Sequence, residues 1–216
     1  MTTETRRTEV LKSSPRMFDS EILDRLSRVH PAVPVVIFLP AVSIMLALRA
    51  AELGALATVG LVAAGYAVWT LSEYWIHRGV FHFEPEEGLG ARLHWIIHGV
   101  HHDHPNDPLR LVMPPSVSVP VSSLLVLLFW AVLGSPYFLP FSAGFFGGYL
   151  AYDMTHYALH HHTPRTRLGR RLRELHMRHH FQDDTTGFGI SAPYWDRAFG
   201  TAPGAADKPA ERTARP

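Results

Sequence analysis

Histidine is the residue whose number and spacing point to chemistry in this chain. The 216 residues contain 15 histidines, against 20 lysines and arginines combined. Ten of them form four clusters: His77 with His82; His98 with His101 and His102; His156 with His160; and His176 with His179 and His180. Spacings of three and four residues place side chains on one helix face, where imidazole nitrogens can share a metal ion. The clusters therefore predict a metal site.

Ten imidazoles are more than one four- or six-coordinate ion accepts, so the pattern predicts two metal ions. In the second cluster, the spacing predicts that His94, His98 and His101 share one helix face. In the fourth cluster, the three-and-four spacing predicts that the later two histidines point toward the first. His94, four residues before His98, is a candidate additional ligand. The spacing leaves open how the ligands divide between the two ions. The other four histidines lie outside the repeated spacing and are not predicted to bind metal: His30, His104, His161 and His162.

Two carboxylates near the clusters are candidates to orient the ligands. The second ring nitrogen of a metal-bound histidine commonly donates to a carboxylate or a carbonyl. Asp153 lies three residues before His156, and Glu73 lies four residues before His77. Each could instead cap a helix or pair with an arginine.

The composition excludes several other kinds of site. The chain has no cysteine, which rules out disulfides, iron–sulfur clusters and zinc sites that use thiolates. The formal net charge is +1, and no basic stripe with interleaved aromatic residues suggests a nucleic-acid partner. No serine or cysteine nucleophile and no H-E-x-x-H element stands out, which argues against a hydrolase. Histidine ligation beside apolar helices instead suits activation of dioxygen by two irons and attack on an aliphatic C–H bond.

Four apolar runs supply the elements that must position the histidines. They cover residues 32–48, 54–71, 117–133 and 138–152. The first two are each close to the roughly 20 residues that a membrane-spanning helix needs. A turn signal at Gly134-Ser135-Pro136 separates the last two. The runs predict an all-α integral membrane four-helix bundle of two helical hairpins, with a histidine-rich helical cap. The fourth run is short and rich in glycine, so we expect it to pack tightly without necessarily crossing.

Charge asymmetry predicts the topology. Every lysine and arginine except Arg49 lies in the N-terminal, middle or C-terminal polar segments. The positive-inside rule then places both termini and the metal site of a multi-pass protein in the cytoplasm. Residues 1–31 form a polar leader without the apolar core of a signal peptide, residues 32–200 the membrane domain, and residues 201–216 a disordered tail. Within the leader, the helical spacing of Phe18, Ile22, Leu26 and Val29 predicts a short helix, either interfacial or a soluble cap.

Several short sequence motifs resemble those of the fatty acid hydroxylase superfamily, the sterol desaturase-like membrane di-iron proteins. They are Glu73-Tyr74 to His77-Arg78, Phe81-His82-Phe83, His98-Gly99-Val100-His101-His102, Asp107 to Pro115, Tyr152-Asp153 with His156 and His160, His176 with His179-His180, and Gly187-Phe188-Gly189-Ile190-Ser191. The histidine spacing also fits sterol desaturases, carotenoid hydroxylases and, less well, acyl desaturases. The Arg-Leu-Val-Met-Pro-Pro and Gly-Phe-Gly-Ile-Ser motifs favour the fatty acid 2-hydroxylases, which modify sphingolipid acyl chains.

The resemblance implies a reaction and its cofactors. All ten clustered histidines are implied to bind two iron ions, which zinc can replace in recombinant material. Dioxygen and two electrons are implied to convert the carbon next to an acyl carbonyl into a 2-hydroxy product. Tyr152, Tyr157 and Trp95 either line the substrate entrance or are ordinary interfacial aromatic residues.

The resemblance also bears on partners. Many eukaryotic relatives carry an N-terminal haem-binding cytochrome domain, whereas only the polar leader precedes the apolar runs here, so we expect a separate electron-transfer protein. A basic stretch could dock an acidic electron carrier or, as we favour, anionic lipid headgroups; it contains Arg165, Arg167, Arg170, Arg171 and Arg173. One alternative is the same di-metal chemistry on a sterol, carotenoid or ether lipid. Another is a histidine-rich metal transporter or sensor, which would place its ligands inside the spans.

Overall fold

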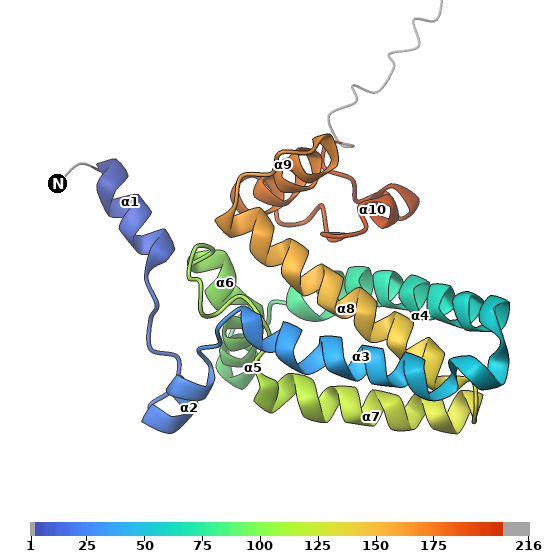
Figure 1. Cartoon of the computed structure of the whole chain (residues 1–216). Helices are drawn as coiled ribbons and strands as arrows, with labels where there is room; N and C mark the ends of the chain where they lie inside the picture. The colour runs from blue at the N-terminus through green and yellow to red at the C-terminus, as the bar shows by residue number, and fades with distance from the viewer. Residues whose placement is uncertain (1–2, 205–216) are drawn as a thin grey trace, which may run out of the picture.

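Helices form all of the regular structure in residues 3–204, the part of the chain that the computed structural model describes (Figure 1). Four are long: α3 (Ala32–Leu53), α4 (Ala55–Ile76), α7 (Pro115–Leu133) and α8 (Phe138–His161). The shorter ones are α1 (Thr3–Lys12), α2 (Glu21–Leu26), η1 (His77–Phe81), α5 (Gly88–His94), η2 (Trp95–Gly99), α6 (Val100–Asp103), α9 (Arg167–Phe181) and α10 (Tyr194–Ala198). The predicted all-α class is confirmed.

Two glycines allow the long helices to form hairpins. Gly54 separates α3 from α4 with a φ of 73°, and Gly134 ends α7 with a φ of 68°. A residue with a side chain is strained in this left-handed region, so glycine is favoured where the chain reverses after a helix. Both hairpins are therefore present, and Figure 1 shows the four long helices running side by side.

Helix α8 is the centre of this arrangement, since it packs against α3, α4 and α7. A β-carbon on Gly144 would lie 2.0 Å from the Val62 carbonyl oxygen, and one on Gly65 would lie 2.0 Å from the Phe141 carbonyl oxygen. The backbones of α4 and α8 thus touch, as small residues allow in helix pairs. The tight packing that we predicted for the glycine-rich run is confirmed, but α8 is longer than predicted because the helix continues through its polar half to His161.

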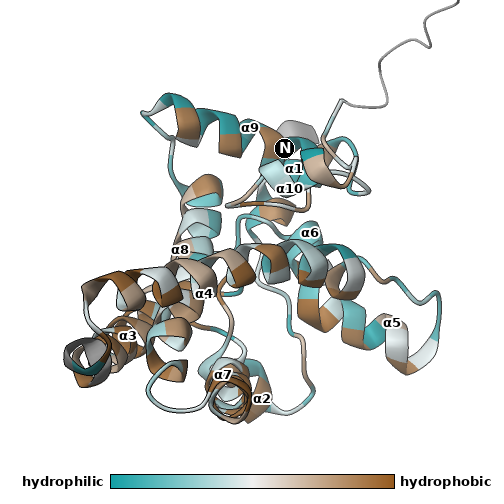
Figure 2. Cartoon of the chain, turned by 90° about the vertical axis from the view of Figure 1, so that its right-hand side faces the viewer, coloured by the Kyte–Doolittle hydropathy of each residue, from teal (hydrophilic) through white to brown (hydrophobic). Residues whose placement is uncertain are grey.

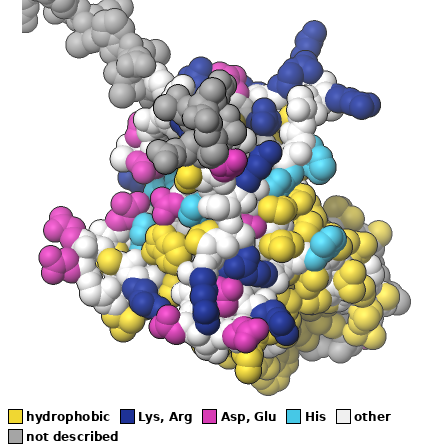
Figure 3. Space-filling view, turned by 90° about the vertical axis from the view of Figure 1, so that its left-hand side faces the viewer, with side chains coloured by type: hydrophobic (Ala, Val, Ile, Leu, Met, Phe, Trp, Pro, Cys, Tyr) yellow, Lys and Arg dark blue, Asp and Glu magenta, His cyan; other side chains and the backbone are white. Residues whose placement is uncertain are grey.

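Two helical segments are long and apolar enough to cross a membrane, namely Ala55–Phe81 and Pro115–Leu133. Only 17% and 6% of their most apolar stretches are buried inside the protein. Exposed apolar surface of this extent is typical of a protein that contacts lipid. Hydrophobic residues, brown in Figure 2, predominate along α3 and α7. Seen from the end that carries α1, α2 and α6, charged side chains spread over the surface beside hydrophobic ones (Figure 3).

The N-terminal segment differs from the sequence prediction. Helix α2 covers only six residues, and α1 was not predicted. The four spaced apolar residues do not share one helix face, because Val29 lies beyond α2 and is buried, where its N–H donates to the Leu109 carbonyl at 2.6 Å. Ile22, by contrast, is 72% exposed. The predicted longer helix does not form, because Val29 is hydrogen-bonded to Leu109, in the segment before α7.

The predicted disordered tail begins too early in the sequence. The Thr201 N–H donates to the Asp196 carbonyl at 2.8 Å, and the Thr201 carbonyl accepts from the Gly187 N–H at 2.9 Å. The prediction is therefore wrong for residues 201–204, which belong to the fold. The rest of that predicted tail, residues 205–216, lies outside the described residues.

Replacing Gly144 by alanine should separate α4 from α8. We expect Gly144→Ala to lower the free energy of unfolding by about 1–3 kcal/mol or more, because the new methyl group meets backbone that cannot rotate away. Thermal unfolding of the detergent-solubilised protein would measure this. Gly147→Ala is the matched control on the same helix, since its β-carbon would meet nothing within 4 Å. Equal melting temperatures for the two variants would contradict close packing of α4 on α8.

Candidate metal centre

The ten clustered histidines gather into two groups of five in the interior of the protein. The first group contains His77, His82, His98, His102 and His179. The second group contains His101, His156, His160, His176 and His180. In each group, one ring nitrogen from every member lies within 4.8 Å of those of the other four. The structure thus brings together all ten residues that the sequence singled out and divides them equally.

Consecutive histidines belong to different groups. On an α-helix, residues four apart share a face and adjacent residues point about 100° apart. His98 and His102 therefore enter the first group, while His101 enters the second. On α9 the order is reversed, because His176 and His180 enter the second group and His179 the first. The expectations that His179 points toward His176, and that His98 and His101 share one face with His94, were wrong for this reason.

A wide helical turn brings His77 and His82 together although they are five residues apart. Residues 77–81 form the π-helix η1, and the His82 N–H donates to the His77 carbonyl at 3.1 Å. In a π-helix, each N–H bonds to the carbonyl five residues earlier instead of four. Side chains five residues apart, such as those of His77 and His82, can therefore lie on the same face. A second π-helix, η2, precedes His101 and contains His98. Periodicity in the sequence did not indicate either turn.

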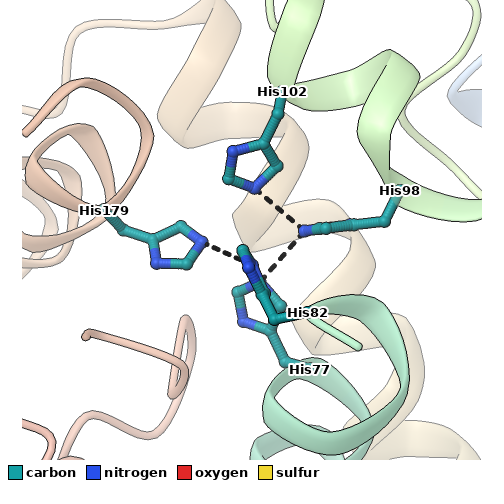
Figure 4. Close-up of side chains that lie close together, drawn as sticks. All are labelled: His77, His82, His98, His102 and His179. Carbon is teal, nitrogen blue, oxygen red and sulfur yellow. Dashed lines mark hydrogen bonds between the residues drawn. The ribbon is translucent and has the colours of Figure 1, made fainter. Parts of the chain in front are cut away.

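The spacing between ring nitrogens suits a shared metal ion. In the first group the Nε2 atoms of His77 and His98 lie 3.3 Å apart, and those of His98 and His102 lie 3.0 Å apart (Figure 4). In the second group the Nε2 atoms of His101 and His156 lie 3.1 Å apart. Nitrogen ligands at about 2.0–2.1 Å from one ion have neighbours roughly 3 Å away. Neutral rings at this distance can also share a proton in an N–H···N hydrogen bond, so the convergence of five rings in each group, and not one distance, indicates a metal.

The charge state and hydrogen bonding of these rings also fit a metal. Burial lowers the pKa of His82 and of His102 to about 3, so both rings are neutral near pH 7 and keep a lone pair for a ligand. Burial likewise lowers the pKa of His101. Both ring nitrogens of His180 are buried without a hydrogen-bond partner. Cations held by the converging lone pairs would satisfy groups that otherwise have no partner.

Backbone carbonyls, and not the predicted carboxylates, orient two rings of the first group. The Nδ1–H of His77 donates to the Phe188 carbonyl at 2.7 Å, and that of His179 donates to the Thr186 carbonyl at 2.7 Å. Because a carbonyl only accepts, Nδ1 must carry the proton, and the Nε2 lone pair faces the centre of the group. The prediction missed these acceptors, since every residue has a carbonyl and the sequence does not indicate which one is near.

The two carboxylates have different partners from those that we predicted. Glu73 accepts hydrogen bonds from the backbone N–H of Ser191, at 2.7 Å, and from its hydroxyl. Asp153 accepts from the Tyr149 hydroxyl at 3.3 Å. Within residues 3–204, neither carboxylate is bonded to a histidine ring. Glu73 nevertheless acts on the first group indirectly, because Ser191 belongs to the loop whose Phe188 carbonyl orients His77.

Asp196 is the second anchor of that loop and was not predicted. Its carboxylate accepts from the N–H of Phe188 at 2.8 Å, from the N–H of Gly189 at 2.9 Å and from the Thr201 hydroxyl at 2.9 Å. The residue is 1% exposed. The Gly-Phe-Gly-Ile-Ser motif is thus a loop held by two buried carboxylates, Glu73 on α4 and Asp196 on α10.

The remaining histidines with described contacts lie outside both groups. His94 Nε2 is 3.8 Å from a Glu84 carboxylate oxygen, so the candidate additional ligand does not join the other ten. His104 Nδ1 lies 2.7 Å from the Val10 carbonyl oxygen, which attaches the N-terminal segment to the end of α6. The His161 ring packs on Tyr157, with 4.3 Å between their centroids.

An apolar cavity of about 410 Å³ reaches both histidine groups. His98 of the first group and His101 and His156 of the second form part of its wall. The wall between the long helices is mainly apolar and aromatic, and it includes Trp69, Leu125, Phe145 and Phe146. Of the three aromatic residues considered for a substrate entrance, Tyr152 lines this cavity, whereas Trp95 and Tyr157 do not.

Comparison with known proteins now identifies the family. The sequence model of the fatty acid hydroxylase family matches residues 62–201, which hold all ten histidines. The chain belongs to the fatty acid hydroxylase family. Within that family, it is 37% identical to a dihydroceramide fatty acyl 2-hydroxylase of Arabidopsis thaliana, over 90% of this chain and 83% of the relative. The fatty acid 2-hydroxylase of Rattus norvegicus is 40% identical, over 66% of this chain and 39% of the relative.

A solved structure in the family has the same fold. The visible hydroxylase domain of full-length scs7p superimposes with a TM-score of 0.79 at 34% identity, covering 88% of this chain and 72% of that one. This chain is thus a hydroxylating oxidoreductase of the fatty acid hydroxylase family, and the resemblance noted from its phrases is confirmed.

Removing the Asp196 carboxylate should release the loop at residues 187–191. We expect Asp196→Ala to lower the free energy of unfolding by at least about 2 kcal/mol, since the buried N–H groups of Phe188 and Gly189 lose their acceptors. Thermal unfolding would measure the loss. Glu174→Ala, which removes exposed ion pairs to Arg171 and Arg178, should change stability by less than about 0.5 kcal/mol. Similar effects of the two changes would contradict the anchoring role.

Proposed function

We propose that this protein hydroxylates the acyl chain of a lipid at the carbon next to the carbonyl. The observation that carries the proposal is the apolar cavity whose wall includes histidines of both groups. Such a cavity can hold an aliphatic chain, while the histidines mark the place of reaction. The names of the relatives, dihydroceramide fatty acyl 2-hydroxylase and fatty acid 2-hydroxylase, support the same position on the chain.

Each histidine group is proposed to hold one iron ion, with zinc as a substitute in recombinant protein. The metals, when bound, supply the activation of dioxygen; one oxygen atom enters the C–H bond, and the other leaves as water with two electrons and two protons. The chain's own residues supply neutral nitrogen ligands, a fixed ring orientation and a dry cavity. Trp69, Phe145 and Phe146 exclude water from the bound chain and hold it by apolar contact.

We further propose a multi-pass membrane topology with the metal centre and both termini on the cytoplasmic side. The two apolar segments and the distribution of basic residues support it. A separate protein is proposed to deliver the electrons. Four arginines of the basic stretch are exposed, namely Arg165, Arg167, Arg170 and Arg171, although Arg170 donates to the Arg165 carbonyl and Arg171 pairs with Glu174. Arg173 is used internally, because its Nε–H donates to the Leu159 carbonyl at 2.8 Å.

Metal content should follow the division of histidines into two groups. We expect about two metal ions per wild-type chain and about one in His160→Ala with His176→Ala, because both changes remove ligands from the second group alone. Elemental analysis after removal of loosely bound metal would measure this. His30→Ala with His104→Ala, outside both groups, should keep two ions. Loss of both ions or of neither in the second-group variant would contradict the assignment.

The reaction is tested by the lipids of a host that expresses the chain. We expect a gain of one oxygen on acyl chains, which fragmentation places at the carbon next to the carbonyl, and no gain with His101→Ala and His179→Ala, one ligand from each group. Mass spectrometry of extracted lipids measures both. A change in sterol, carotenoid or ether lipids instead would move the activity to those substrates. No change in any lipid, with purified metal-loaded protein also inactive under reductant and dioxygen, would overturn the proposal.

A further inference from the structure

The apolar cavity reaches the surface of the protein along one side. Most of the residues in its wall are buried or half-buried, but seven are exposed: Leu23, Leu26, Ile76, Ile97, Ser116, Val117 and Val121. We call these seven residues the rim. Six of them are apolar and none carries a charge. An apolar rim is unfavourable in water but not in hydrocarbon, so it indicates an opening that faces lipid.

The rim lies between two helices that do not cover each other. Helix α8 packs against both α4 and α7, whereas among the described helices α4 and α7 have no comparable packing with one another. Trp69 and Ile76 of α4 line one side of the cavity. Val117 and Val121 of α7 line the other side, and Phe145 of α8 belongs to the wall between them. Because α8 closes the cavity from behind, its open side lies between α4 and α7.

This open side lies at membrane depth. Helices α4 and α7 belong to the two segments that are long and apolar enough to cross a membrane. Val117 and Val121 lie in the first two turns of α7, up to about 9 Å from its start at Pro115, against a hydrocarbon core of about 30 Å. Ile76 is the last residue of α4, directly before His77 of the first group. In the proposed topology, the opening therefore faces the leaflet nearest the histidines.

Away from the long helices, the N-terminal segment closes the cavity. A surface cleft there is polar, and it is lined by Arg16, Asp19, Arg92 and Trp95. Met17 and Phe18 line both this cleft and the apolar cavity, so they lie between the two. Met17 is buried, and its N–H donates to Asp24 Oδ1 at 2.7 Å. The pairing of Asp24 with Arg28 and Arg110 thus holds a wall between the cavity and water.

We propose that the acyl chain enters the cavity sideways from the bilayer, through the opening between α4 and α7. The inference rests on the proposed function and deepens it, because it names the source and the route of the substrate. A chain that moves this way passes from lipid into the cavity without leaving apolar surroundings. The rim is thus an interaction surface for the lipid of one leaflet, and it continues the exposed apolar surface of the same two helices.

Photochemical labelling tests the route with the full-length chain in phosphatidylcholine vesicles. The probe is an N-hexadecanoyl long-chain amino alcohol that resides in the bilayer and carries a diazirine at the end of its acyl chain. We expect adducts on Trp69, Phe145 and Phe146, which line the cavity and are each 8% exposed or less. Mass spectrometry of the peptides measures these cavity adducts.

Blocking the rim should prevent this labelling. The chain has no cysteine, so Val121→Cys offers a single thiol to a pyrene maleimide. We expect the modified variant to form about tenfold fewer cavity adducts, because the pyrene fills the passage between α4 and α7. Leu124→Cys is the matched control, since Leu124 is 66% exposed on the same helix but lies outside the cavity wall. The same reagent there should change the adducts by less than about twofold, because the passage stays open.

A block in the polar cleft separates the bilayer route from an aqueous one. Arg92→Cys with the same maleimide should leave the cavity adducts in place, since Arg92 lines the cleft and not the cavity. Retention of the adducts with modified Val121→Cys, an equal loss with Leu124→Cys or with Arg92→Cys, or no cavity adducts in the wild-type chain would each overturn the proposal. Labelling needs neither metal nor dioxygen, so failure of the proposed reaction would leave these results unchanged while no lipid gains oxygen.

Discussion

The structure depends on keeping ten neutral imidazoles close together with their lone pairs converging. Such an arrangement is unfavourable without cations, because aligned lone pairs repel and buried nitrogens lack partners. It must therefore be held by surroundings that do not move. Helices α8 and α9 and the π-helices provide them, since each ligand lies on or directly beside a helix. Burial lowers the pKa of rings such as His82, which keeps them neutral and able to bind metal.

The position of α8 connects the metal centre to the substrate cavity. One half of this helix packs backbone to backbone with α4 through Gly144, and the other half carries His156 and His160. The same helix thus lines the apolar cavity and supplies ligands at its end. Because α8 is surrounded by α3, α4 and α7, its polar residues are tolerated, while α4 and α7 present apolar surface outward. The arrangement of the helices therefore keeps the histidines of α8 in the interior and the apolar surface of α4 and α7 on the outside.

Contacts between distant parts of the chain complete the site. The C-terminal loop at residues 187–191 orients His77 on η1, and Glu73 and Asp196 fix that loop from two sides. Asp24 pairs with Arg110 and ties the N-terminal segment to the cavity wall. Ligands, their hydrogen-bond acceptors and the substrate pocket thus come from segments far apart in sequence, which only the folded helices bring together.

The sequence by itself determined the four long helices, their two hairpins and the ten histidines, because apolar runs, turn residues and helical spacing are local properties of the chain. It could not assign His101 and His102 to different groups, since that depends on the direction of adjacent side chains and on π-turns that periodicity does not reveal. Nor could it find the Phe188 carbonyl or the pairing of Arg110 with Asp24, 86 residues away. Only the tertiary structure decided these features, because hydrogen-bond partners are fixed by distance in space and not by distance along the chain.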